Sequence, residues 1–170
     1  MDILPADAGF TVRAAEADFS FDIIGEALPP FDGGRLAGVR PLPPRRKSYP
    51  LPSGFSDGDG RKLLLAMEGD RLAGYIALSP GWNGIGVIGD LAVDRGFRRR
   101  GVARGLLAEA DTWSHAKGLA GLFAETQTNN VDACRFYEAC GFVLAGFDRL
   151  LYAAIEEHRA ETALFWYRLY

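Results

Sequence analysis

One stretch of the sequence combines residue types that could bind an anionic ligand. It reads Asp90-Leu-Ala-Val-Asp-Arg-Gly-Phe-Arg-Arg-Arg-Gly-Val-Ala103, so a strand-like run passes through an Arg-x-x-Gly-x-Ala loop into a helical pattern. The first N–H groups of a helix have no partner inside it, and the helix dipole adds positive charge there. Gly101 would let a phosphate approach the backbone, and Arg98, Arg99 and Arg100 would supply a cationic rim. The stretch predicts a diphosphate site, or else a solvated arginine-rich turn; it lacks the spacing of a nucleotide P-loop.

A second motif follows one strand later. It runs Asn130-x-x-Ala-x-x-Phe-Tyr137-x-x-x-Gly-Phe142, in which Asn130 can cap a helix and Gly141 can end it. Together the two motifs resemble those of the GNAT superfamily of acetyl-CoA-dependent N-acetyltransferases. Within that superfamily the chain is most similar to the streptothricin acetyltransferases. The matching stretches are Trp82-Asn83, Asp90-Leu-Ala-Val93, Glu125-Thr-Gln127, Phe147-Asp-Arg-Leu-Leu-Tyr152 and Ala163-Leu-Phe-Trp-Tyr167.

This resemblance implies acetyl-CoA as the co-substrate. The pantetheine arm would pair with the strand that ends at Val93, and the backbone after Arg98 would take the pyrophosphate. Asn130 would bond the pantetheine arm or the substrate, or act only as a helix cap. Tyr137 resembles the family's general acid, which protonates the departing CoA thiolate, and a phenol with a pKa near 10 suits that task; the alternative is a core aromatic. The implied cofactor-binding residues are Leu91, Ala92, Val93, Arg98, Arg99, Arg100, Gly101, Val102, Ala103, Arg104, Asn130 and Tyr137.

The acceptor amine must be neutral when it attacks the thioester. Keeping a lysine-like amine of pKa ~10.4 neutral at pH 7 costs ~4–5 kcal/mol, which a base or a depressed pKa must offset. Asp90 and Glu125 are the predicted catalytic carboxylates, and both would attract a cationic substrate; alternatively they hold loops by hydrogen bonding. Relatives read Ile-Glu-Asp where this chain reads Ile88-Gly89-Asp90, so the family's base assignment does not transfer directly. Tyr152 and Trp166 are the other predicted substrate contacts.

Three functions fit these residues. The leading hypothesis is direct acetyl transfer, in a ternary complex, to a primary amine of a small cationic molecule such as streptothricin, whose β-lysine amine is acetylated in that family. Protein or peptide N-acetylation is the second hypothesis. A non-catalytic acyl-CoA-binding sensor is the third, because Gly89 replaces a family carboxylate. No metal is expected, since neither the two histidines nor the two cysteines have close ligand companions.

The elements that must position these residues follow from periodicity and turn residues. Apolar runs around the Gly69-Asp70 turn predict a hairpin, and a third strand and a helix follow. The proline- and glycine-rich stretch 28–60 predicts an irregular substrate-side wall, or a disordered excursion. The expected strands are 62–68, 72–78, 85–93, 119–126, 142–153 and 162–170, and the expected helices are a short one at 19–28 and two longer ones at 102–117 and 130–140.

The predicted fold class is α/β of the α+β type, a GNAT fold. Its mixed, mostly antiparallel, twisted sheet would have six to seven strands flanked by about four helices. We expect one acetyltransferase domain, 1–170, with a substrate-side segment (10–60), an acetyl-CoA-binding core (61–142) and closing strands (143–170). The net charge of −3 disfavours nucleic-acid partners. No secretion signal or membrane span is evident, so we expect a cytoplasmic protein whose exposed sheet edges would permit a homodimer.

Overall fold

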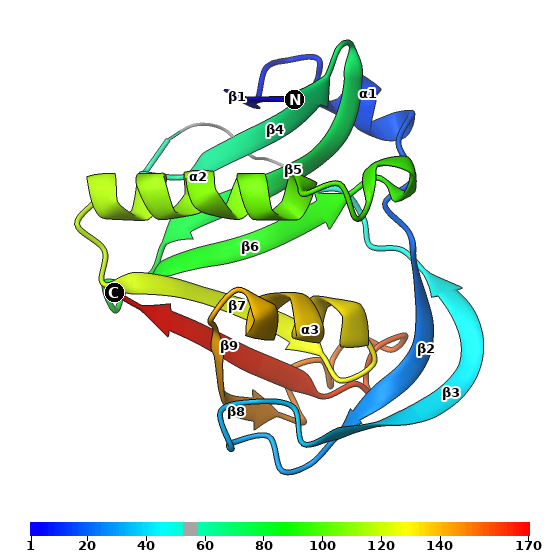
Figure 1. Ribbon diagram of the computed structural model, residues 1–170. Helices are drawn as coiled ribbons and strands as arrows, with labels where there is room; N and C mark the ends of the chain where they lie inside the picture. Colours follow the sequence, from blue (N-terminus) through cyan, green and yellow to red (C-terminus); the bar gives the residue numbers. More distant parts are fainter. Residues whose placement is uncertain (53–57) are drawn as a thin grey trace. The chain divides into compact units, whose positions relative to one another are not determined.

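The structure, a computed structural model, describes residues 1–52 and 58–170 (Figure 1). The chain forms two compact units, each made from two separate stretches of sequence. The first unit contains residues 1–21 and 48–122, and the second contains residues 22–47 and 123–170. None of the helices in the described ranges is long and apolar enough to cross a membrane.

The first unit is built on four antiparallel strands. They are β1 (Asp2–Pro5), β4 (Lys62–Glu68), β5 (Arg71–Pro80) and β6 (Gly86–Val93), hydrogen-bonded in the order β1-β4-β5-β6. A short helix α1 (Phe10–Ala15), a 3₁₀ helix η1 (Arg95–Phe97) and the longer helix α2 (Val102–Ala116) accompany them. Helix α2 runs across β4, β5 and β6 (Figure 1) and buries Leu106 and Ala110 completely. The predicted hairpin, third strand and helix are therefore confirmed.

A β-bulge interrupts the pairing of β5 with β6. Ala77 lies opposite Asp90, whereas the next residue, Leu78, lies opposite Ile88. Gly89 is therefore the extra residue of β6 that has no partner in the register. Bulges bend a strand and change the direction in which its next side chain points. The bulge therefore lies directly before Asp90, at the glycine that stands where similar proteins were expected to have a glutamate.

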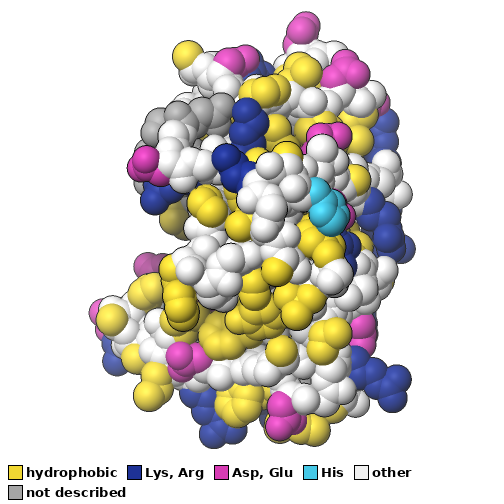
Figure 2. Space-filling view, turned by 90° about the vertical axis from the view of Figure 1, so that its left-hand side faces the viewer, with side chains coloured by type: hydrophobic (Ala, Val, Ile, Leu, Met, Phe, Trp, Pro, Cys, Tyr) yellow, Lys and Arg dark blue, Asp and Glu magenta, His cyan; other side chains and the backbone are white. Residues whose placement is uncertain are grey.

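The second unit combines three strands of the main sheet with a separate two-stranded sheet. Strands β7 (Gly121–Gln127), β9 (Ala163–Leu169) and β8 (Val143–Asp148) are hydrogen-bonded in that order, and β8 is antiparallel to β9. Helix α3 (Val131–Ala139) follows β7, while β2 (Phe21–Leu28) pairs with β3 (Gly38–Lys47). The face shown in Figure 2 exposes many hydrophobic side chains among scattered charged ones, and β8 itself exposes Val143 and Phe147.

The fold class is confirmed: the main sheet is mixed and has seven strands. Three α-helices and the 3₁₀ turn take the place of the expected four or so helices in the described ranges. The described structure also contains β1 and α1, for which the sequence analysis predicted no element.

The expected helix at 19–28 is wrong, because this segment is strand β2. Its burial alternates: Ile23 and Ala27 are buried, while Asp22 and Ile24 are exposed. A period of two is that of a strand, and Gly25 also disfavours a helix. Within the stretch 28–60, residues 53–57 lie outside the described residues. The described residues 28–52 and 58–60 differ from the irregular wall or disordered excursion that was predicted, since they include strand β3 despite its three prolines. Prolines fit there because β2–β3 is only a two-stranded sheet, so β3 has an edge that needs no N–H donors.

Two further details of the second unit differ from the sequence-based expectation. The expected strand 142–153 ends at Asp148, so Tyr152 lies in a turn. The helical spacing of Ala133, Phe136, Tyr137 and Cys140 predicts these four as the inward stripe of α3, whereas its buried side chains are those of Val131, Cys134 and Tyr137. The inward face of the helix is therefore rotated from the predicted one, although Tyr137 lies on both.

Candidate active site

The predicted diphosphate loop lies in the first unit, between β6 and α2. Buried Asp94 caps the 3₁₀ helix, because its Oδ1 accepts a hydrogen bond from Gly96 N at 2.8 Å, and its Oδ2 accepts one from Asp18 N at 2.7 Å. Arg99 and Gly101 then adopt left-handed φ angles of 62° and 84°. Gly101 is the N-cap of α2 and makes no side-chain capping bond. The first N–H groups of α2 therefore lack the usual side-chain cap, which suits the predicted anion site.

The three arginines of this loop differ in their surroundings. Arg98 donates from Nε to Val93 O at 3.1 Å and from Nη2 to Ser20 O at 2.5 Å. Its guanidinium therefore joins the loop to the end of β6 and to the backbone just before β2. Arg100 pairs with Glu68 at 2.7 Å. The side chains of Arg99, in the turn, and of Arg104, in α2, are exposed, and that of Ala103 is half-buried. Arg98 and Arg100 thus have partners within the first unit, and the cationic rim and the contacts of this backbone with CoA stay predictions.

Asp90 receives a hydrogen bond from a buried tyrosine of the same unit. Tyr75 Oη donates to Asp90 Oδ2 at 2.7 Å, and the Tyr75 ring packs edge-on against Phe10 and Phe19. Burial raises the pKa of Asp90, although the bonds from Tyr75 and from Leu91 N–H oppose the rise. Burial and the neighbouring charge of Asp90 also raise the pKa of Tyr75, so this phenol stays a donor. A raised pKa makes a half-buried carboxylate a stronger proton acceptor.

Sequence reasoning missed Tyr75. It lies in an apolar run of β5 and reads as an ordinary core residue. The available signal was chemical: a tyrosine inside such a run must place its hydroxyl near a polar partner. Identifying Asp90 as that partner requires the strand register, in which Tyr75 pairs with Ala92.

The second predicted carboxylate, Glu125, lies on β7 in the second unit. The Tyr152 hydroxyl donates to Glu125 Oε1 and accepts a bond from Gln127 Nε2 at 2.9 Å. Glu125 is exposed, while Tyr152 and Gln127 are half-buried. The structure therefore brings two predicted site residues together, and it adds Gln127 to them.

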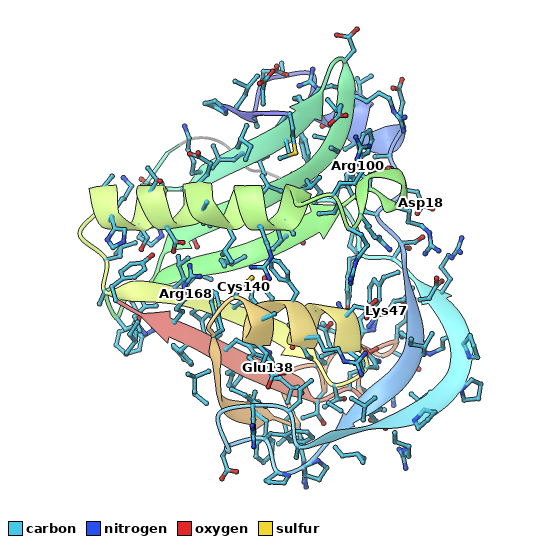
Figure 3. The ribbon with its side chains drawn as sticks, in the orientation of Figure 1. Asp18, Lys47, Arg100, Glu138, Cys140 and Arg168 are labelled. Carbon is cyan, nitrogen blue, oxygen red and sulfur yellow. The ribbon has the colours of Figure 1, made fainter. Side chains whose placement is uncertain are left out.

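Helix α3 carries the other predicted residues of this unit. Asn130 Oδ1 accepts a bond from Ala133 N at 3.3 Å, which confirms its role as a helix cap. Tyr137 is only 5% exposed and lies edge-on between Phe136 and Phe142. At the end of this helix Arg168 donates to Cys140 O at 2.9 Å, and both residues are labelled in Figure 3. The packing against Phe136 and Phe142 fixes the ring of Tyr137, and its catalytic role stays a prediction.

Trp166, which was predicted to contact substrate, is a core residue of the second unit. Its side chain is completely buried, and its Nε1 donates to Thr126 Oγ1 at 2.9 Å. The same threonine hydroxyl lies 3.3 Å from Cys134 Sγ. Trp166 therefore joins β9 to β7 inside the second unit. Its indole can be buried because the N–H donates a hydrogen bond to Thr126.

Comparison with known proteins establishes the family. The model of the acetyltransferase (GNAT) family matches residues 32–142, so the chain belongs to this family. It is 37% identical to a streptothricin acetyltransferase of Escherichia coli over 136 residues, covering 80% of this chain and 77% of that protein. The chain is thus an acetyl-CoA-dependent acetyltransferase.

Two solved structures resemble the whole chain. One is described as a streptothricin acetyltransferase from Bacillus anthracis in complex with acetyl coenzyme A; it has a TM-score of 0.89 and 30% identity, and the match covers 99% of both chains. The other is a nourseothricin acetyltransferase with a TM-score of 0.83 and 26% identity, where the match covers 99% of this chain and 97% of that one. The likeness therefore includes the N-terminal 31 residues and the segment 143–170, both of which lie outside the family match.

Proposed function

We propose that this acetyltransferase transfers the acetyl group of acetyl-CoA to a primary amine of a small cationic molecule of the streptothricin kind. The observation that carries the proposal is the extent of the likeness to streptothricin acetyltransferases. It spans nearly the whole chain, including the segment 143–170 that carries Tyr152. An exposed carboxylate held by that tyrosine, Glu125, supports a cationic acceptor. The match to the GNAT family model alone would support acetyl-CoA as the co-substrate but would not indicate the acceptor.

The proposed chemistry is direct attack in a ternary complex. Acetyl-CoA supplies an acetyl group that is already activated as a thioester, so no protein nucleophile is required. The amine nitrogen bonds to the carbonyl carbon, the carbon–sulfur bond breaks, and the ammonium proton leaves toward a base. We assign Asp90 or Glu125 to accept that proton, directly or through water, and Tyr137 to protonate the departing thiolate. The backbone from Arg99 to Arg104 would hold the pyrophosphate, and Leu91 to Val93 the pantetheine arm.

The role of Tyr137 is testable by removing one oxygen atom. Tyr137→Phe keeps the ring that packs on Phe136 and Phe142, so the fold is retained. We expect kcat to fall by about 100-fold or more, the usual contribution of a general acid, with the KM for acetyl-CoA changed less than about twofold. Tyr167→Phe is the matched control, with unchanged kinetics expected. Equal losses of turnover and of acetyl-CoA affinity would instead assign Tyr137 a structural role.

The acceptor is tested with a panel of amines and mass detection of the products. Streptothricin, aminoglycosides, polyamines and a lysine peptide cover the proposed substrate and the peptide alternative. We expect fast acetylation of streptothricin alone. Acetylation only of the peptide would favour the second hypothesis and refute the first. Mass detection also avoids thiol reagents, which the half-buried Cys140 could consume.

Two properties of the protein beyond its chemistry are proposed on the same basis. We place the enzyme in the cytoplasm, where acetyl-CoA is made and where thiols such as Cys134 and Cys140 stay reduced. We also propose a homodimer, because β8 is a terminal strand of the sheet order and exposes Val143 and Phe147. Sedimentation at micromolar concentration would distinguish a dimer from a monomer.

A further inference from the structure

Strand β7 presents two polar side chains on one of its faces. Leu122, Ala124 and Thr126 are buried, so the alternate residues of the strand face the other side. On that side Phe123 packs against the rings of β9, and Glu125 and Gln127 come next. Because side chains repeat every second residue at ~3.3 Å rise per residue, Glu125 and Gln127 stand about 7 Å apart. One group placed between them can therefore bond both.

The Tyr152 hydroxyl occupies that position, and the two bonds it makes have fixed directions. Gln127 Nε2 carries only hydrogens, so it donates and the hydroxyl oxygen accepts, at 2.9 Å. The hydroxyl then has one proton left, which it donates to Glu125 Oε1. The result is a directed chain, Gln127 to Tyr152 to Glu125. Its last member is a carboxylate that receives a charge-assisted bond on Oε1 and belongs to an exposed residue, so it remains open to a further partner.

The turn that carries Tyr152 is fixed at its far end. Just before β9 begins, Glu161 accepts two bonds from Lys47 Nζ at 2.6 and 2.7 Å, and both side chains are buried. Thr128 N, one residue beyond β7, donates to Thr162 O at 3.0 Å. Lys47 is labelled in Figure 3 near the end of β3. These contacts fix the C-terminal end of the segment 149–162 beside the end of β7, which lowers the conformational freedom that the Tyr152–Glu125 bond has to overcome.

We propose that Gln127 and Tyr152 are positioning residues that hold Glu125 as an oriented anion for the ammonium group of the acceptor. This inference rests on the proposed function, since it requires a cationic acceptor. The acceptor's affinity then depends on the chain of bonds, whereas the affinity for acetyl-CoA does not. Tyr152 and Gln127 act only through Glu125 and touch neither the acetyl group nor the thiolate.

Steady-state kinetics with both substrates varied test the proposal. Tyr152→Phe and Glu125→Gln are each expected to raise the KM for streptothricin about tenfold or more, the effect of losing a hydrogen bond to a charged group. The KM for acetyl-CoA is expected to stay within about twofold. Gln127→Met frees the hydroxyl to turn away from Glu125, so a smaller rise of a few fold is expected. Tyr167→Phe is the matched control, since its hydroxyl makes no hydrogen bond within the described part of the chain.

The double variant separates positioning from direct contact. If Tyr152 acts through Glu125, then adding Tyr152→Phe to Glu125→Gln changes the acceptor KM by less than about twofold. Additive losses would show that Tyr152 contacts the acceptor itself and would overturn the proposal. A parallel rise in the KM for acetyl-CoA would overturn it too, because a general structural defect affects both substrates.

The two proposals fail in different ways. If the wild-type enzyme does not acetylate streptothricin, the proposed substrate is wrong, and the same variants are then measured with whichever cationic amine of the panel is acetylated. If the wild-type enzyme acetylates streptothricin and the KM of Tyr152→Phe is unchanged, the proposed function stands and the positioning role is refuted.

Discussion

Breaking the buried ion pair of the second unit should cost more stability than breaking an exposed pair of the same unit. Lys47 and Glu161 have side chains only 6% and 9% exposed and are joined by two short bonds. Burial lowers the pKa of Lys47, against the attraction of Glu161. For Glu161 burial alone would raise the pKa, but the bonds from Lys47 and Asn129 outweigh it, and the net pKa is lowered. Each charge is therefore stabilised mainly by its partner.

Lys47→Met keeps the apolar stem and removes the charge. It leaves Glu161 buried with only Asn129 and His158 beside it, and breaking a buried ion pair typically costs about 3–5 kcal/mol. For a chain of this size that corresponds to a fall in Tm of about 6–20 °C. Adding Glu161→Gln removes the stranded carboxylate and should restore most of the loss, because replacing both charges is nearly neutral. The assay is urea unfolding at pH 7 with linear extrapolation to water.

Arg40→Met is the matched control. Arg40 pairs with Glu26 between β3 and β2, but its side chain is 62% exposed. An exposed pair contributes at most about 1 kcal/mol, so this variant should lose little. The reasoning fails if Lys47→Met loses no more stability than Arg40→Met, or if the double variant is less stable than Lys47→Met alone.

Three further predictions concern single groups. The pKa of Glu161 is lowered from 4.5 in the folded state, so its ionised carboxylate stabilises the fold above about pH 4.5, and this contribution is lost as the pH falls through the lower folded pKa. The free energy of unfolding measured against pH should fall over this acid range, and Glu161→Gln should make that fall less steep. A Cβ at Gly89 would meet only Ala77 O, at 3.8 Å, so Gly89→Glu should change the free energy of unfolding by less than about 1 kcal/mol; a loss above about 2 kcal/mol in urea unfolding would contradict the open site. Burial raises the pKa of Cys134 to about 11, so a thiol reagent should label Cys140 alone in the native protein and both cysteines in urea; native labelling of Cys134 would contradict this.

Sequence patterns predicted the central part of the chain well, for a local reason. Between Lys62 and Gly141 the hairpin turn, the helix caps and the apolar periodicity all act within a few residues of one another. Asn130 caps α3 and Gly118 takes its left-handed conformation just past α2, as their types indicate. The acetyl-CoA motifs lie within this part, so family and co-substrate could be predicted together.

The rest of the structure depends on contacts between distant residues. The Lys47–Glu161 pair joins residues 114 positions apart, and Tyr75 finds Asp90 only through the register of β5 and β6. The local sequence of residues 19–28 predicts a helix, but pairing with β3 stabilises the segment as strand β2. Likewise, nothing in the sequence near Trp166 indicates that Thr126, 40 residues away, accepts its N–H. Pairings of this kind need the tertiary structure.

The most direct test of the proposed function is product analysis after incubating the enzyme with acetyl-CoA and streptothricin. Mass spectrometry with fragmentation would identify both the number of acetyl groups added and the amine that carries them. Our account predicts that the wild-type enzyme adds a single acetyl group to the β-lysine amine. Tyr137→Phe and Glu125→Gln should each form less of this product in the same time. Unmodified streptothricin alongside an acetylated lysine peptide would contradict it.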